Sequence, residues 1–386
     1  MKKYFTFLIF LLLLFFNSSL VLAIEKQDKQ QVEDNPKIER LYDYIQNMKT
    51  DEEILNGLDA REYITNYMKN GQGSLSTGQL IKACTALLLK EVRSTLQLMI
   101  SLIVLAIISA LLRNLQSSFS GESVSNIAFY ACYAVMIMLL TKSFLISLNL
   151  AKETITKLSD FTAVLLPSLV FLLATVGGLT QAATADPIVV AAVGLTPRLY
   201  IDIIIPIILT GFVLGFVNNL SEEHKINGLC KVLKQYILWF QGIIMTIFIG
   251  LLTVRGIASN TLDVVTLKTA KFAVDNFIPI VGKALSDTIA TMAGYSLLLK
   301  NAISSIGLLI IIILMLFPVI KIAIIAFVYK ISAALIEPIA DKRIVNCVVS
   351  ASESLILLMS CVISITVMFF IMVSIMASAG KFIVGG

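Results

Sequence analysis

Residues 355–376 read LILLMSCVISITVMFFIMVSIM and contain no charged side chain. At about 1.5 Å per helical residue, the run is about 33 Å long, which matches the hydrocarbon core of a bilayer. Lipid offers no hydrogen bonds to the backbone, so a segment within it must satisfy its own amide and carbonyl groups, as a helix does. The run therefore predicts a transmembrane helix.

Seven further apolar runs, most of them long enough to cross a bilayer, divide the chain of 386 residues. Charged residues make up 14% of the sequence, whereas soluble domains carry about a quarter. The runs span residues 96–112, 127–148, 161–177, 199–217, 237–254, 303–317 and 319–336. Shorter segments at 185–197 and 288–299 favour half-helices or re-entrant hairpins. We predict an all-α polytopic membrane protein with about seven to nine transmembrane or re-entrant helices.

The first 23 residues have the features of a secretory signal. Lys2 and Lys3 precede a short apolar core, and small residues at Val21 and Ala23 mark a cleavage site. A retained signal anchor is the competing interpretation, but the core is short for a membrane span. We expect cleavage after Ala23, which places the following residues outside the cytoplasm.

Residues 24–94 are predicted to form a small extracytoplasmic region of amphipathic helices, ahead of a multi-pass domain at 95–386. One helix begins near Pro36, because apolar residues recur at helical spacing from Ile38 to Met48. A second ends at the glycines of 71–73, and a third starts near Ser76 or Thr77. Such narrow apolar faces make a thin core, so the region leans on the membrane, on the rest of the chain or on a partner, unless it is a solvated hairpin.

The orientation of the multi-pass domain depends on the lysine cluster at 225–234, which the positive-inside rule places in the cytoplasm. With the mature N-terminus outside, an odd number of crossings must precede this cluster. Four clear apolar runs precede it, which is an even number. Either residues 185–197 also cross, or one of the four runs does not.

A charged linker at 255–288 separates two apolar runs. Lys268, Lys271 and Asp275 share one helical face, and apolar residues occupy the opposite face. A break is expected between Pro279 and Gly282. Exposed charge pairs four residues apart contribute only about 0.3–0.5 kcal/mol each. The linker is therefore either a solvated surface, the lining of an aqueous cavity or a docking shelf.

Candidate conduit or assembly residues follow from the charged and irregular positions in this linker and in the apolar runs. A charge within the membrane needs a partner or water, although side chains near span ends, such as Lys330 and Arg198, can reach the interface. The candidates are Lys268, Lys271, Asp275, Asn276, Pro279, Gly282, Lys283, Asp287, Asp202, Lys321 and Glu337.

Motifs for catalysis are absent from the sequence. It has no P-loop, no H-E-x-x-H and no G-x-S-x-G, so we expect no enzyme and no cofactor. The single histidine, His224, and five scattered cysteines without a C-x-x-C spacing predict no metal site. The sequence contains no basic block with interleaved aromatic residues, so we do not expect nucleic acid as a partner.

A faint internal similarity links residues 166–178 to residues 278–294 through a proline and a later A-T-x-x-G. Duplicated halves with interrupted segments are a feature of secondary transporters. A stand-alone permease is therefore one alternative function, and a non-conducting membrane scaffold is another.

Several long stretches resemble the stage III sporulation protein AE family of endospore-forming Firmicutes over nearly the full length. They include TLKTAKFAVDNFIPIVGKALSD (266–287), LKNAI (299–303), KEVRSTLQLM (90–99), RNLQSSFSGESVSNIAFYACY (113–133) and YKISAALIEPIADKRI (329–344). The resemblance implies a multi-pass protein of the mother-cell membrane around the forespore, a subunit of a channel or secretion-like complex needed for late forespore gene expression. It implies as partners the other products of the same operon, including an ATPase and ring-forming proteins, and a forespore membrane protein. The resemblance is also compatible with a homo-oligomer. It supplies no catalytic residue that could be assigned to a position of this sequence.

Overall fold

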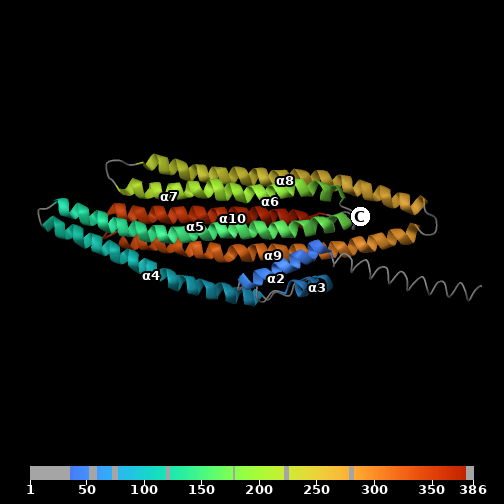
Figure 1. The fold of residues 1–386 in the computed structure, drawn as a ribbon, viewed down its shortest axis with the longest axis horizontal. Helices are drawn as coiled ribbons and strands as arrows, with labels where there is room; N and C mark the ends of the chain where they lie inside the picture. The colour runs from blue at the N-terminus through green and yellow to red at the C-terminus, as the bar shows by residue number, and fades with distance from the viewer. Residues whose placement is uncertain are drawn as a thin grey trace, which may run out of the picture.

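The computed structural model describes seven stretches of the chain, and all of the regular secondary structure in them is helical (Figure 1). The stretches are 35–51, 59–71, 77–118, 122–176, 179–220, 226–277 and 282–379. The helices are α2 (Pro36–Asp51), α3 (Ala60–Asn70), α4 (Thr77–Ser118), α5 (Glu122–Thr175), α6 (Leu179–Leu199), the π-helical turn η2 (Tyr200–Ile204), α7 (Ile205–Leu220), α8 (Asn227–Phe277), α9 (Gly282–Ile336) and α10 (Lys342–Ser378). The signal segment predicted at residues 1–23 lies outside the described residues.

The long helices form an elongated bundle in which successive passes run in opposite directions (Figure 1). The helices α6, η2 and α7 follow one another without a gap and make one pass. At the centre, α10 packs against α5, α7, α8 and α9. The helices α7 and α8 meet at one end of the bundle, whereas α8 and α9 meet at the other end, toward which α2 and α3 also lie (Figure 1).

Six helical segments in the described part of the chain are long and apolar enough to cross a membrane, in agreement with the predicted all-α polytopic class. They are Leu88–Leu111, Phe129–Thr175, Ala191–Leu220, Asn227–Val254, Thr291–Ile336 and Lys342–Ser378. The runs at 127–148 and 161–177 both lie in α5, and those at 303–317 and 319–336 both lie in α9. The count of about seven to nine transmembrane or re-entrant helices stays a prediction.

The two short segments are not half-helices, because 185–197 lies within α6 and 288–299 within α9. Continuity through α6 depends on how its prolines are accommodated. Pro197 cannot bond to the carbonyl of Val193, and the hydroxyl of Ser159 donates to that oxygen at 3.2 Å instead. Just beyond, Pro206 has no amide hydrogen to donate to the carbonyl of Asp202. The helix there takes the wider π-helical form, in which the amide of Ile205 donates to the carbonyl of Tyr200.

The outer face of α5 indicates why it holds two apolar runs. Its exposed side chains are apolar from Tyr130 to Ile146, apart from Lys142, whose chain can reach toward an interface. From there to Asp160 the exposed residues are polar, namely Asn149, Glu153, Thr156 and Asp160. The second run is apolar because its inner face packs in the bundle, where Phe161, Leu165 and Leu169 are fully buried. We interpret the two runs as parts of one pass, because a single continuous helix of 54 residues holds both of them.

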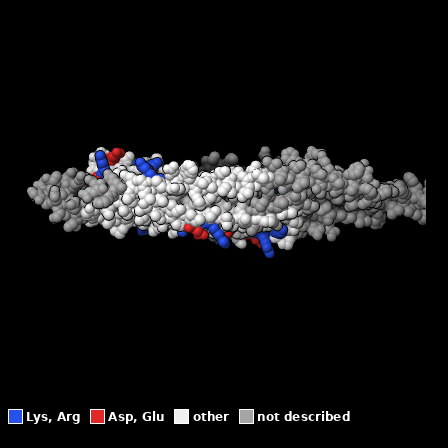
Figure 2. All heavy atoms as spheres, turned by 90° about the horizontal axis from the view of Figure 1, so that it is seen from above, with Lys and Arg blue, Asp and Glu red and all other residues white. Residues whose placement is uncertain are grey.

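The opposite side of the bundle has a different surface. The residues of α8 from Tyr236 to Val254 include no charge, and many of them are exposed. Figure 2, which looks down on this side, shows the middle of the described surface uncharged, with charged side chains at its edges. Such a surface suits contact with lipid.

In the described part of the chain, three passes precede the lysine cluster at 225–234, namely α4, α5 and the combined pass of α6, η2 and α7. Three is the odd number that an extracytoplasmic N-terminus and a cytoplasmic cluster require. The even count from the sequence arose because α5 holds two of the four runs, and because 185–197 belongs to the same pass as 199–217.

The helices α2 and α3 lean on the bundle, as one of the interpretations of the sequence expected. Ile38, Leu41 and Ile45 of α2 have 0% exposure, and α2 packs on α5. Tyr44 lies against Phe161. The burial of Tyr44 is the main cause that raises the pKa of its phenol, and the negative charge of the neighbouring Asp160 is the second. The phenol therefore stays neutral.

The ends of α3 follow from local sequence. The side chain of Asp59 accepts from the amides of Arg61 and Glu62, and Gly71 closes the helix with a φ of 70°, which glycine adopts without strain. The hydroxyls of Tyr63 and Ser305 lie 3.0 Å apart and tie α3 to α9. The predicted start of the third helix near Ser76 or Thr77 is confirmed, since α4 begins at Thr77.

We predict that Leu41→Ala loosens α2 from α5, because removing a fully buried leucine side chain costs about 2–5 kcal/mol. Limited proteolysis of the full chain in membrane vesicles should then cut α2 faster, whereas Arg40→Ala, at the exposed neighbour, leaves the rate unchanged. Equal cleavage rates for wild type and Leu41→Ala would contradict the docking of α2.

Candidate functional site

A row of polar residues attaches α8 to the rest of the bundle. Asn227, Lys234 and Gln241 are spaced by seven residues, and Phe248 continues the row. Residues seven apart lie on nearly the same side of a helix. Each member contacts α7 or α10, and we call this contact the α8 seam.

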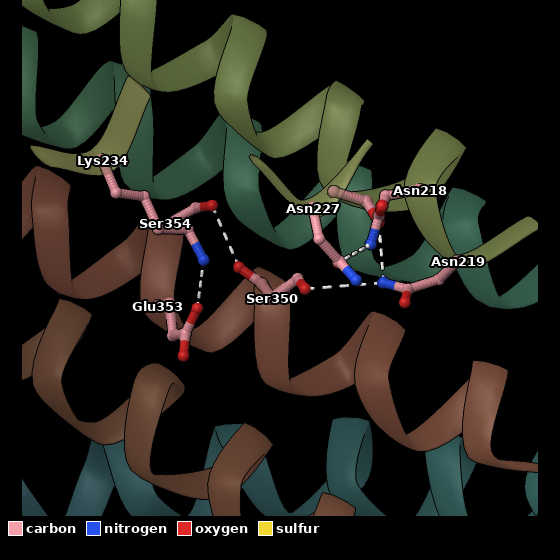
Figure 3. Close-up of polar contacts among 8 residues, drawn as sticks. Asn218, Asn219, Asn227, Lys234, Ser350, Glu353 and Ser354 are labelled. Carbon is pink, nitrogen blue, oxygen red and sulfur yellow. Dashed lines mark hydrogen bonds and ion pairs between the residues drawn. The ribbon is translucent and has the colours of Figure 1, made fainter. Parts of the chain in front are cut away.

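The first contact of the α8 seam joins the ends of α7 and α8 (Figure 3). The amide of Asn218 donates to the side-chain oxygen of Asn227 at 2.6 Å. Next to it, the side chain of Asn219 donates to the carbonyl of Gly215 at 2.7 Å and lies 3.5 Å from the hydroxyl of Ser350 on α10. These bonds fix α7, α8 and α10 relative to one another at this end.

Gly215 makes the close approach of α7 to α10 possible. A Cβ atom at this position would lie 3.2 Å from the Cβ of Ser350, closer than most such contacts. Small residues at helix contacts in membranes have this effect, because they let backbones come together.

The second contact is an ion pair between Lys234 of α8 and Glu353 of α10 (Figure 3). The two side chains are 30% and 44% exposed, so the pair lies at the rim of the helix contact. One turn of α10 is further linked by the hydroxyl of Ser354, which donates to the carbonyl of Ser350 at 3.0 Å. A carboxylate within an apolar segment is costly without a partner, and Lys234 supplies one.

The third contact is centred on Gln241, which is only 5% exposed. Its side-chain nitrogen donates to the sulfur of Cys361 at 3.1 Å, and its oxygen accepts from the hydroxyl of Ser360 at 3.1 Å. The hydroxyl of Ser364 lies 3.5 Å from the same oxygen. This amide thus holds α8 on α10 in a part of the bundle that is otherwise apolar.

The arrangement can position helices rather than react with a substrate. Its polar groups are amides, hydroxyls, the Cys361 thiol and one ion pair, and their hydrogen bonds hold them in place. Polar contacts between membrane helices each contribute about 0.6–2 kcal/mol, so the α8 seam fixes the register of α8. Within the described ranges, no group of three potential metal ligands occurs. Cys132, Cys230, Cys347 and Cys361 are free thiols.

The predicted candidates lie elsewhere. Lys268, Lys271, Asp275 and Asn276 fall in the far part of α8, Gly282, Lys283 and Asp287 fall in the first turns of α9, and Pro279 lies outside the described residues. The side chains of all of these lie outside the description too. The expected interruption near Pro279 agrees with the end of α8 at Phe277 and the start of α9 at Gly282. This end of α8 is opposite the end where Asn227 meets α7 (Figure 1).

The three remaining candidates, two within the apolar passes and one just after a pass, have different surroundings. Lys321 pairs with the buried Glu91 of α4 at 3.4 Å, as the cost of an unpaired charge leads one to expect. Asp202 is exposed in the π-turn, and Glu337 is exposed just after α9. The structure does not bring these three together.

Sequence reasoning missed the α8 seam and a buried lysine. The signal for the α8 seam was available, as three polar residues at intervals of seven at the start of an apolar run. Lys300 has 0% exposure, and its ammonium group donates to the carbonyls of Met376 and Ala377 at 3.3 and 3.1 Å and to that of Ala379. A cation is favourable at the C-terminal end of a helix, but only the fold brings Lys300 to the end of α10.

Comparison with known proteins agrees with the resemblance seen in the sequence. Residues 58–380 match the family described as stage III sporulation protein AE. A relative of that name from Bacillus subtilis (strain 168) is 33% identical over 312 residues, which cover 81% of this chain and 78% of the relative. No solved structure matches the chain. The matched residues include every helix from α3 to α10.

We predict that reversing either charge of the second contact, by Lys234→Glu or Glu353→Lys, destabilises the protein, because two like charges then face each other. Since the pair is partly exposed, the expected loss is about 1 kcal/mol, seen as a lower apparent Tm in detergent. The exchange of both charges should restore most of it, and Gln235→Glu, at an exposed position of α8, serves as control. A double variant no more stable than the single ones would contradict the pairing.

Proposed function

This chain belongs to the stage III sporulation protein AE family and has a role in sporulation, and we propose that it is a membrane subunit of a complex linking the mother cell and the forespore. The family is one of sporulation proteins and is not a known enzyme family. The six segments capable of crossing a membrane among the described residues support a place in the cell membrane.

The filled core of the bundle is the observation that favours a subunit over a self-contained channel. Large apolar side chains with 0% exposure occupy the interior over the part of the bundle whose side chains the structure describes. They include Phe144, Leu158 and Leu165 on α5, Ile303 and Ile311 on α9, and Leu358 and Ile365 on α10. A conduit that involves this protein would therefore run between copies or between the protein and its partners.

In this proposal the protein lies in the mother-cell membrane around the forespore. The end of the bundle near α2, α3 and the meeting of α8 with α9 faces the intermembrane space, and the end with Lys231 and Lys234 faces the mother-cell cytoplasm. The predicted signal segment and the lysine cluster support this orientation. Proteins of the same operon, including an ATPase and ring-forming components, and a forespore membrane protein are the proposed partners.

A non-conducting scaffold is the second candidate, and the same filled core favours it. A stand-alone permease has less support, because transporters build central sites from broken helices, whereas α6, η2 and α7 and also α9 run on through their prolines. Transport of a solute by the purified protein in liposomes would favour the permease.

We predict that Glu353→Lys, made in the organism that encodes the chain, reduces heat-resistant spores and late forespore reporter expression at unchanged protein level. The physical reason is that a displaced α8 alters the surface offered to partners. The exchange Lys234→Glu with Glu353→Lys should restore both readouts, and Gln235→Glu should have no effect. Normal sporulation in a strain that lacks the protein would overturn the proposed role.

A further inference from the structure

We propose that the partly exposed side of α10 between α8 and α9 forms a groove that binds an anionic phospholipid. The phosphate of this lipid would pair with Lys231, Lys330 and Lys342. This inference concerns a ligand site and does not rest on the proposed role in sporulation. We call this feature the α10 groove.

The floor of the α10 groove is one side of α10 that no other helix fully covers. Val349, Ile356, Ile363, Val367 and Phe370 are spaced by three, four or seven residues, so they follow one side of the helix. All five are partly exposed, whereas neighbours such as Val348, Leu355 and Val362 have 0% exposure. The floor is apolar and about 30 Å long.

The walls of the α10 groove follow from the contacts of α8 and α9 with α10. Lys234 and Gln241 place α8 along one side of this stripe. The hydroxyl of Ser352 donates to the carbonyl of Ala326 at 2.8 Å and places α9 along the other side. On α9, Lys330 and Phe327 lie on the exposed side, away from Lys321, which faces α4.

The same contacts set the heights of the three lysines. Lys231 is one turn before Lys234, which pairs with Glu353, and Lys330 is one turn after Ala326, which meets Ser352. The two lysines are therefore nearly level on opposite walls of the α10 groove. Lys342 begins α10, within about 12 Å of that level along the axis. All three side chains lie at the end that the positive-inside rule assigns to the cytoplasm.

The charge at this mouth of the α10 groove is positive. Nearby acids are occupied, since Asp341 pairs with Arg343 and Glu353 pairs with Lys234. Lys231, Lys330 and Lys342 are all exposed. None of the three forms an ion pair with another described residue. Among the described residues, Glu337 is the exposed acid at this end, and one carboxylate does not balance three lysines. Basic pockets between membrane helices on the cytoplasmic side are typical sites for anionic lipid headgroups.

The size of the floor residues favours a lipid over another helix as the occupant. Helices approach one another in membranes through glycine, alanine and serine, which let the backbones come close. The floor instead presents valine, isoleucine and phenylalanine, which keep a helix at a distance but suit a flexible acyl chain. A phospholipid with a negative headgroup satisfies both the apolar floor and the basic mouth.

The test is native mass spectrometry of the full chain, purified in detergent and titrated with phosphatidylglycerol or phosphatidylcholine. The triple variant Lys231→Gln, Lys330→Gln and Lys342→Gln should lower retention of phosphatidylglycerol by about tenfold or more and leave phosphatidylcholine unchanged. Ile363→Trp, which fills the floor without changing charge, should also lower retention. The matched control is Lys37→Gln, Lys69→Gln and Lys152→Gln, at lysines toward the other end of the bundle.

Three outcomes would overturn the lipid site. Equal losses for the two triple variants would mean that attraction to overall charge explains the binding. Displacement of the lipid by soluble glycerol phosphate would assign the lysines to a free anion. Photo-crosslinking from Val367 in membranes to a second polypeptide, rather than to lipid, would make the α10 groove a helix-binding site.

Discussion

The packing of α10 against four other helices is the constraint on which the rest of the bundle depends. Lipid is as apolar as a leucine side chain, so membrane helices associate through close contact and polar bonds rather than through the hydrophobic effect. Small residues give α10 this contact, since Ala351 and Ser352 are fully buried and α7 approaches through Gly215. Once α5, α7 and α9 are placed around α10, the interior is filled.

The attachment of α8 has a different physical basis. Much of its membrane segment is exposed, and its contacts with α7 and α10 include Asn227, Lys234 and Gln241. In an apolar surrounding these groups find few other partners, so they select one register of α8 against α10. This register also defines the α10 groove, because Lys234 and Gln241 hold α8 at its edge.

Local signals in the sequence predicted the helix ends near Pro36, Gly71 and Thr77, since caps and breakers act over a few residues. The number of passes was harder to predict, because an apolar run has the same composition whether lipid or protein covers it. Only the fold shows that α2, α6, α9 and α10 pack on α5, the helix that holds two of the runs. The α8 seam was encoded in a spacing of seven, but its partners are more than a hundred residues away in the chain, except for Asn218.

The alternation of passes is tested most directly by thiol labelling in intact cells or right-side-out vesicles. Single cysteines at Asp43 on α2 and at Lys231 on α8 would be placed in a background without the five native cysteines. An impermeant reagent should label position 43 from outside, and position 231 only after the membrane is opened. Labelling of both positions from the same side would contradict the three passes that separate them.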